Sequence, residues 1–260
     1  MKLKDQISII QNFTIFPNNK ERLDLITSEV GLKSTAKVLK DCNFYVNYKT
    51  TTFLEEIESV YSKNIKNLFL YNNLEDSDFY WPAVELQLIL QSDTPYVMLV
   101  SEDRMFNNTT HKEFQSIMDD MIRHNVSYMP IGKLFVYTSG SKHKNIMDVP
   151  SISSSYKEGG EHLWLYKAKN SPGKSFSIDA IYKRELIIEK LEEIIHQYGK
   201  EMSPNAKFPK NMPHYFEDYY TDSFGNGVKK CGNMMCAVPK KEIVVSDETP
   251  GFIRLKSKQN

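Results

Sequence analysis

Hydrophobic and polar positions follow two different patterns along the first 140 residues. Short runs rich in β-branched and aromatic residues alternate with longer segments in which apolar residues recur every three or four positions. Runs of the first kind predict strands, and segments of the second kind predict amphipathic helices. Strands that alternate with helices are typical of a mostly parallel sheet covered by helices, so we predict an α/β protein.

The boundaries of these elements follow from their flanking residues. We predict strands over Phe13 to Pro17, Asn43 to Tyr48, Asn67 to Asn72, Tyr96 to Ser101, Tyr128 to Ile131 and Lys133 to Thr138. We predict helices over Lys20 to Lys40 with a break at Val30-Gly31, Thr52 to Ser62, Pro82 to Gln91 and Thr110 to Asn125. The last helix places on one face Phe114, Ile117, Met118, Met121 and Ile122.

The pattern changes after residue 138. Residues 139–175 are rich in serine, glycine and proline, and they predict a long, partly ordered excursion. Ile181 to Gln197 predicts a strongly amphipathic helix that ends before Tyr198-Gly199. A loop rich in proline and lysine follows, then the aromatic and acidic segment Tyr215 to Tyr220, a glycine-rich stretch and a last strand near Glu242 to Val245.

Composition narrows the classes of protein. A chain of 260 residues that is 40% hydrophobic and 25% charged can bury a sizeable core. The formal net charge is zero and no basic stripe is present, so we expect no nucleic-acid partner. No run approaches 18 apolar residues, so we expect no transmembrane segment, although peripheral contact with a membrane stays open. Three cysteines without zinc-site spacing favour a reducing, cytoplasmic location.

The segment from Thr94 to Arg104 carries the strongest chemical signal. Five apolar residues lead to Ser101, Glu102 and Asp103, a pattern typical of a central parallel strand whose carboxyl end projects acids into a crevice. Adjacent carboxylates repel each other, and a divalent cation, Mn²⁺ or Mg²⁺, that bridges a diphosphate relieves this repulsion. The alternative is an acidic strand end capped by Arg104 or by the following helix.

This order of elements, with Tyr-Val-Met-Leu-Val-Ser-Glu-Asp ending the fourth strand, resembles the GT-A glycosyltransferases, particularly the family-2-like bacterial enzymes. In that family a short acidic motif holds the metal and the diphosphate of the sugar nucleotide. Ser101 replaces the first acid here, which puts strict metal dependence in doubt. The resemblance makes Asp103 the metal ligand and Glu102 a contact to ribose or sugar. It also implies five further donor-binding residues, which are Thr14, Phe16, Asn18, Asn47 and Arg104.

A second, looser likeness covers Phe176 to Glu185 and Met212 to Asp218. It resembles the part of bacterial sugar transferases that contacts the acceptor and carries the catalytic base. The resemblance implies Glu217 as the base, with Asp218 as second choice, because a base must take the proton from the acceptor hydroxyl. It also implies donor contacts from Asp179 and Lys183 and acceptor contacts from Trp164 and Tyr215. Solvated acids between tyrosines are the competing interpretation of Glu217 and Asp218.

We therefore expect one GT-A-like domain over residues 1–260, with a nucleotide-sugar-binding half at 1–140 and an acceptor-side half at 141–260. The expected reaction transfers a sugar from a UDP- or GDP-sugar to a hydroxyl of a glycan or glycolipid, with inversion and with metal assistance. A sugar-phosphate nucleotidyltransferase and a non-catalytic glycan- or partner-binding protein on the same fold are the alternatives. The signatures of common hydrolases, kinases and dehydrogenases are absent from the sequence.

Overall fold

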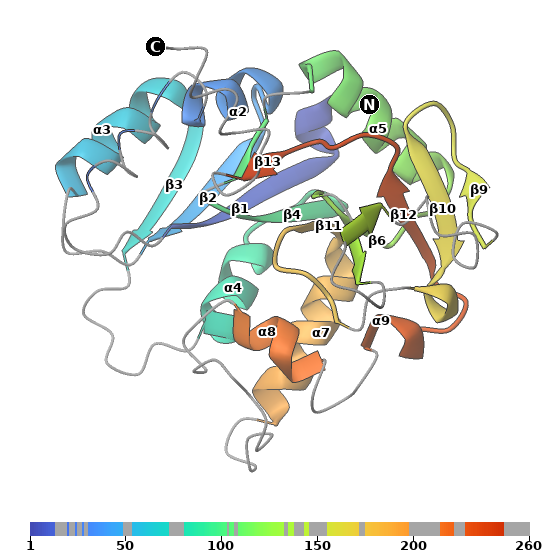
Figure 1. Ribbon diagram of the computed structural model, residues 1–260. Helices are drawn as coiled ribbons and strands as arrows, with labels where there is room; N and C mark the ends of the chain where they lie inside the picture. Colours follow the sequence, from blue (N-terminus) through green and yellow to red (C-terminus); the bar gives the residue numbers. More distant parts are fainter. Residues whose placement is uncertain are drawn as a thin grey trace.

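A computed structural model of the chain gives the arrangement of its elements (Figure 1). It describes residues 1–13, 20, 24, 28, 31–48, 54–72, 81–102, 104–106, 109–132, 135–137, 143–145, 155–171, 175–197, 214–220 and 227–246. The strands are β1 (Ile7–Phe13), β2 (Asn43–Tyr48), β3 (Asn67–Asn72), β4 (Tyr96–Ser101), β5 (Arg104–Met105), β6 (Tyr128–Pro130), β7 (Phe135–Tyr137), β8 (His143–Asn145), β9 (Lys157–Glu158), β10 (Leu163–Lys167), β11 (Ala180–Lys183), β12 (Met235–Pro239) and β13 (Val245–Ser246).

A nine-stranded sheet in the order β3-β2-β1-β4-β11-β6-β12-β10-β9 is the centre of the fold. The pairings β3-β2, β2-β1, β1-β4 and β6-β12 are parallel, and the others are antiparallel. All strands of this sheet except β11 and β10 therefore run in the same direction. Strands from residues 1–140 and from residues 141–260 share this one sheet.

Helices cover both faces of the sheet (Figure 1). The helices are η1 (Leu3–Asp5), α2 (Leu32–Val38), α3 (Leu54–Asn64), α4 (Trp81–Leu90), α5 (His111–Arg123), η3 (Ala168–Asn170), α7 (Arg184–His196), α8 (His214–Asp218) and α9 (Gly227–Lys230). Helices α2, α3 and α5 lie on one face, and α4, α7 and α8 lie on the other. The predicted α/β class, with a mixed, mostly parallel sheet and helices on both faces, is confirmed.

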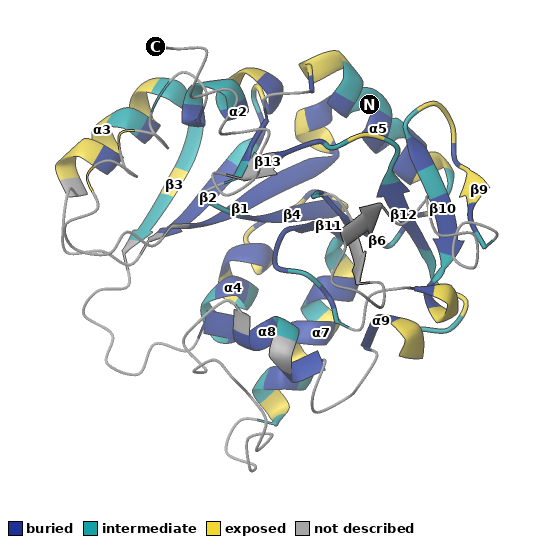
Figure 2. Ribbon diagram, viewed as in Figure 1, coloured by how far each residue is buried: buried dark blue, intermediate teal, exposed yellow. Residues whose placement is uncertain are grey.

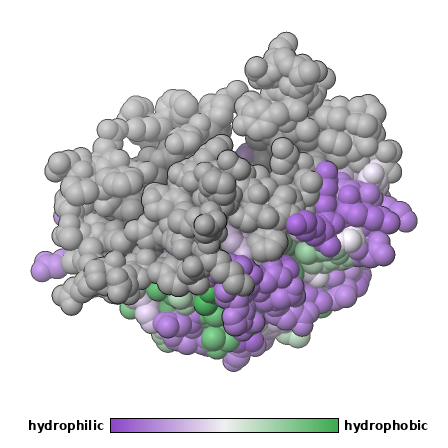
Figure 3. Space-filling view, turned by 90° about the horizontal axis from the view of Figure 1, so that it is seen from below, coloured by the Kyte–Doolittle hydropathy of each residue, from purple (hydrophilic) through white to green (hydrophobic). Residues whose placement is uncertain are grey.

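The sheet separates two hydrophobic cores (Figure 2). Ile7 and Ile9 of β1 pack into the core under α2, α3 and α5, and Ile10 packs into the core under α4 and α7. This alternation follows from the two-residue period of a strand, and burial on both faces is typical of parallel sheets. Seen from below, the described part of the surface is mostly hydrophilic, with a smaller hydrophobic area (Figure 3).

The first strand lies earlier than we predicted. It spans Ile7–Phe13, whereas the apolar pattern suggested Phe13 to Pro17. Polar residues interrupt the apolar run, yet they are buried because partners satisfy them: Tyr61 donates to Gln11 Oε1 at 2.7 Å, and Thr94 Oγ1 donates to Ser8 Oγ at 3.0 Å. A strand that buries paired polar groups does not show as a continuous hydrophobic run.

The second half contains more sheet than we predicted. The expected excursion at 139–175 includes β8, β9 and β10, and β10 is a strand of the main sheet. The predicted helix from Ile181 begins only at Arg184, because Ala180–Lys183 pairs with β4 and β6 as β11. We did not predict β12. Its residues form a strand because they find partners far away in the chain, and such partners leave no local pattern.

Helix α5 spans His111–Arg123, within the predicted range of Thr110 to Asn125, and shows most of the predicted face. Thr110 Oγ1 accepts from the Glu113 amide at 3.2 Å and Glu113 Oε2 accepts from the Thr110 amide at 2.7 Å, which is a capping box. Ile122 was predicted to join the buried face but is 38% exposed, whereas Asp120 is buried. Among the described residues, no helix combines the length and the apolar character needed to cross a bilayer.

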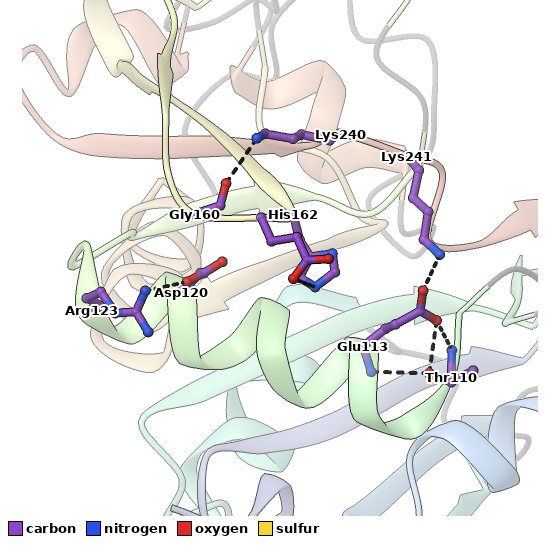
Figure 4. Close-up of polar contacts among 9 residues, drawn as sticks. Thr110, Glu113, Asp120, Arg123, Gly160, His162, Lys240 and Lys241 are labelled. Carbon is purple, nitrogen blue, oxygen red and sulfur yellow. Dashed lines mark hydrogen bonds and ion pairs between the residues drawn. The ribbon is translucent and has the colours of Figure 1, made fainter.

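The segment that follows β12 returns along α5 (Figure 4). Lys240 Nζ donates to the Gly160 carbonyl at 3.0 Å, and Lys241 Nζ donates to Glu113 Oε1 at 2.6 Å. Further along, Thr109 Oγ1 donates to the Ile243 carbonyl at 3.2 Å, and Val245–Ser246 pairs with Arg104–Met105 as β13 with β5. The segment thus links the last strand of the sheet to the carboxyl end of β4.

Replacement of Gly160 by alanine should destabilise the fold. Gly160 has a φ of +90°, and an added Cβ would overlap the buried carboxylate of Asp120 (Figure 4). Strain and overlap together should lower the free energy of unfolding by at least about 2 kcal/mol. Thermal denaturation measures this as a decrease in Tm of about 4–8 °C.

Two other glycines separate the two causes. Gly232 also has a positive φ of +56° but no atom within 4 Å of an added Cβ, and Gly132 has neither feature. We expect about 1 kcal/mol for Gly232→Ala and less for Gly132→Ala. Equal losses at Gly160 and Gly232 would show that the contact with Asp120 is unimportant.

Candidate functional site at the carboxyl edge of the sheet

Three neighbouring parallel strands carry polar residues at or next to their carboxyl ends, at the same edge of the sheet. Asn12 of β1 is in register with Asn47 of β2 on one side and with Ser101 of β4 on the other. Ligands of open α/β sheets bind beyond the carboxyl ends of the strands. The row Asn47, Asn12, Ser101 is therefore the centre of the candidate site.

Helix α4 adds two side chains to this row. Trp81 Nε1 donates to Asn12 Oδ1 at 2.9 Å, and Asn47 Nδ2 lies 3.4 Å from the same oxygen and 3.2 Å from Glu85 Oε1. Asn12, Asn47, Trp81 and Glu85 are all buried. A buried polar network of this kind fixes the orientation of its members when they are satisfied.

Glu85, a member of this network, is not fully hydrogen-bonded within the described part of the chain. Its side chain is completely buried, and its Oε2 atom has no hydrogen-bond partner in the part of the chain that the structure describes. Burial raises the pKa of Glu85 to about 8, against the opposing effect of the Asn47 and Asn12 amides. At neutral pH the carboxyl group is therefore mostly protonated, and it can donate a hydrogen bond as well as accept one.

Glu102 follows Ser101, the last residue of β4, at the same edge of the sheet. Its amide donates to the Asn12 carbonyl at 3.0 Å, which continues the pairing of β4 with β1 by one residue. Burial raises the pKa of Tyr61 well above its ordinary value, and the charge of Glu102 raises it further. The Glu102 carboxylate thus lies close enough to influence the phenol of Tyr61, which itself donates to Gln11.

Asp179 joins β11 to the end of β4. Its Oδ1 accepts from the Ser101 amide at 2.8 Å and lies 3.0 Å from Ser101 Oγ. Its Oδ2 accepts from Arg104 Nε at 2.8 Å in an ion pair. The antiparallel pairing of β11 with β4 brings these residues together although they lie far apart in the sequence.

Glu217 lies next to this cluster. Its Oε1 accepts from the amide of Ile178 at 3.0 Å, and Ile178 directly precedes Asp179. Burial is the main cause of the raised pKa of Tyr128 and Tyr182, and the charge of Glu217 raises both further. The structure thus brings the predicted base to the same edge of the sheet as Ser101 and Arg104.

The remaining predicted residues are placed as follows. Lys183 ends β11 in register with Tyr96, at the opposite edge of the sheet from Ser101, where it donates to Asn125. Trp164 lies on β10, with β11, β6 and β12 between it and β4, and the ammonium group of Lys240 lies 4.7 Å from its ring centre. Tyr215 is 5% exposed and packs against Tyr219. Outside the described residues lie Thr14, Phe16, Asn18, Asp103 and the side chain of Asp218.

A divalent cation at this edge would need several oxygen ligands. Both oxygens of Asp179 already accept hydrogen bonds, and Asp103 lies outside the described residues. Within the ranges that the structure describes, no group of three or more His, Cys, Asp or Glu side chains could hold a metal ion. The described residues alone do not fit a metal, so the predicted ion depends on Asp103.

Sequence reasoning missed Asn12, Trp81 and Glu85. Glu85 is the one carboxylate in the apolar run of Pro82 to Leu90, and a lone acid in such a run is a signal of a buried, paired group. Asn12 was missed because β1 was placed too late in the sequence.

No protein-family model and no curated protein matches the chain. Solved structures that are similar to it include TarS 1-349 from S. aureus, with 14% identity, a TM-score of 0.47, and coverage of 92% of this chain and 60% of TarS. The mannosyltransferase PcManGT from Pyrobaculum calidifontis, in complex with GDP-Man and Mn²⁺, has 9% identity, a TM-score of 0.47, and coverage of 99% and 62%.

A third similar structure is 4-diphosphocytidyl-2C-methyl-D-erythritol synthase from Anaerococcus prevotii, with 8% identity, a TM-score of 0.48, and coverage of 99% of each chain. This chain spans about 60% of the TarS and PcManGT structures. With identities this low and TM-scores below 0.5, the likeness does not identify an activity for this chain.

Replacement of Glu85 by glutamine should change how stability depends on pH. Between about pH 4.5 and 8 the folded protein keeps a proton on Glu85 that the unfolded chain has lost. The contribution of Glu85 to the free energy of unfolding of the wild type therefore falls as pH rises, by up to about 1.4 kcal/mol per unit, and is constant above about pH 8. Glutamine keeps the shape of the side chain but does not titrate. The free energy of unfolding of the variant, relative to that of the wild type, should therefore increase from pH 5 to pH 8.

Urea denaturation of both proteins at several pH values measures this difference. A constant difference between the two proteins across pH 5 to 8 would contradict a buried, protonated Glu85.

Glu113 gives a pH dependence of the opposite sign, because hydrogen bonds from Lys241 and Thr110 lower its pKa to about 2. Its contribution is present above about pH 4.5 and is lost as pH falls, so Glu113→Gln should matter less at low pH.

Proposed function

We propose that the chain transfers a sugar from a nucleoside-diphosphate sugar to a hydroxyl group of a glycan or glycolipid. The observation that supports this proposal is the convergence of Asn12, Asn47, Ser101 and the Asp179-Arg104 pair at one carboxyl edge of parallel strands. Buried amides suit a nucleoside, and an arginine beside an acidic strand end suits a diphosphate. The resemblance of the Ser-Glu-Asp segment to the GT-A motif supports the same class.

In this proposal Glu217 removes the proton from the acceptor hydroxyl. A base must lie within hydrogen-bond reach of the nucleophile, on the face opposite the departing diphosphate. The hydrogen bond from the Ile178 amide to Glu217 Oε1 holds the carboxylate beside the donor edge. An inverting transfer needs one carboxylate of this kind.

Sugar-phosphate nucleotidyl transfer is less well supported. That chemistry favours a loop rich in glycine and arginine after the first strand. The segment after the first strand, Pro17 to Arg22, has one lysine and one arginine but no glycine. Dependence on Mn²⁺ or Mg²⁺ stays a prediction that rests on Asp103.

Nucleotide binding tests the proposal directly. A nucleoside diphosphate at ten times its Kd should stabilise the protein by about 1.4 kcal/mol, which raises Tm by about 3–6 °C. The measurement is a thermal-shift panel of UDP, GDP and the triphosphates, each with and without Mn²⁺. Stabilisation by a triphosphate alone would favour nucleotidyl transfer, and stabilisation by no nucleotide would favour a binding protein without catalysis.

Replacement of Glu217 by glutamine should separate binding from catalysis. The amide oxygen can still accept from Ile178, but glutamine cannot take a proton, so donor binding should persist while transfer falls by at least about 100-fold. Calorimetry with the nucleoside diphosphate and an assay of its release from the donor sugar measure the two properties. A glutamine variant with normal turnover would remove Glu217 as the base.

A further inference from the structure

Asp179 is the point where three parts of the candidate site meet. Its carboxylate accepts from the Ser101 amide at 2.8 Å and from Arg104 Nε at 2.8 Å, and it lies 3.0 Å from Ser101 Oγ. The residue before it, Ile178, donates its amide to Glu217 at 3.0 Å. Two consecutive residues therefore fix the end of β4, the guanidinium group and the predicted base.

The partners of Asp179 make it a poor direct contact for a substrate. Both of its oxygens are engaged within the protein, and its side chain is only 11% exposed. Arg104 is more exposed, because its side chain keeps 30% of its surface accessible. The ion pair with Asp179 holds its guanidinium group through Nε.

The chemistry of the edge indicates what Arg104 contacts. A guanidinium group is always charged and matches the oxygens of phosphates through paired hydrogen bonds. The amide cluster of Asn12 and Asn47 lies on the neighbouring strands, at the distance of one and two strands from Ser101, and Glu85 of α4 contacts Asn47. A ligand with an uncharged ring at the amides and an anionic group at Arg104 has the polarity of a nucleoside diphosphate.

We infer that Arg104 contacts the diphosphate of the donor, and that Asp179 is the positioning residue that holds Arg104 at the end of β4 for this contact. This inference rests on the proposed function, because it specifies which part of the donor binds on this side of the site. It also assigns Asp179 a role different from the donor contact that the sequence resemblance implied. The Asp179 carboxylate orients the guanidinium group of Arg104, and the guanidinium group contacts the diphosphate.

Calorimetric titration of the full chain with UDP and with uridine tests the inference, or with GDP and guanosine if the wild type binds those. We expect Asp179→Asn and Arg104→Gln each to weaken binding of the diphosphate by roughly 10- to 100-fold, the range for a hydrogen bond to a charged group. Binding of the nucleoside should change by less than about 2-fold, because the amide cluster is untouched. The double variant should be no weaker than Arg104→Gln alone.

The ion pair between Asp120 and Arg123 on α5 offers a matched control (Figure 4). It joins the same two residue types at 2.9 Å, and the Asp120 side chain is 5% exposed. Arg123 ends α5 shortly before β6 begins, so this pair lies at the amino edge of the sheet. Asp120→Asn should leave the affinity for the diphosphate and for the nucleoside unchanged.

The outcomes separate this inference from the proposed function. If the wild type binds no nucleoside diphosphate, both are overturned. If the wild type binds the diphosphate and both variants bind it equally well, only the role of Arg104 and Asp179 is overturned. Equal weakening of diphosphate and nucleoside binding would also overturn it, because the pair would then act on the whole site and not on the diphosphate contact alone. Thermal denaturation checks folding, and Arg104→Gln carries the test if Asp179→Asn does not fold.

Discussion

The pairing of buried polar groups at the carboxyl ends of β1, β2 and β4 is the constraint on which the site depends. A buried amide or carboxyl group that lacks a hydrogen bond destabilises a protein by about 1–3 kcal/mol. Asn12, Asn47 and Trp81 meet this requirement through each other and through Glu85. Their orientation is therefore determined by the folded protein before any ligand arrives.

The charged residues at this edge are also held by hydrogen bonds within the protein. Asp179 binds Ser101 and Arg104, and the adjacent Ile178 binds Glu217, so two consecutive residues before β11 connect the end of β4 with Glu217. Preorganised groups of this kind lose little freedom when a substrate binds. The edge of the sheet is thus a rigid frame in which small displacements of β11 would reach both sides.

Local sequence patterns predicted the elements whose partners are near in the chain or whose pattern is regular. Strands β2, β3 and β4 lie at the predicted residues, and α5 begins at His111, one residue after the predicted start. β1 was misplaced because its buried polar residues are satisfied by Tyr61 and Thr94, which a hydrophobic pattern does not reveal. β12 was missed because its pairing partners, β6 and β10, are distant in sequence.

The site shows the same division between local and distant information. The motif at Ser101 and Glu102 was visible in the sequence, since a strand and its acids are consecutive. The contact of Asp179 with Ser101 spans 78 positions, and only the antiparallel insertion of β11 beside β4 creates it. The predicted roles of the site residues remain predictions, because contacts among them do not by themselves identify a reaction.

The place of β12 has a consequence for how the protein is made. β12 lies between β6 and β10, and the β9-β10 pair joins the sheet only through it in the part of the chain that the structure describes. During synthesis, β10 therefore leaves the ribosome about 70 residues before the strand that receives it. Until then its apolar residues and open backbone groups lack their sheet partner, which is the situation in which nascent chains recruit chaperones or associate with each other.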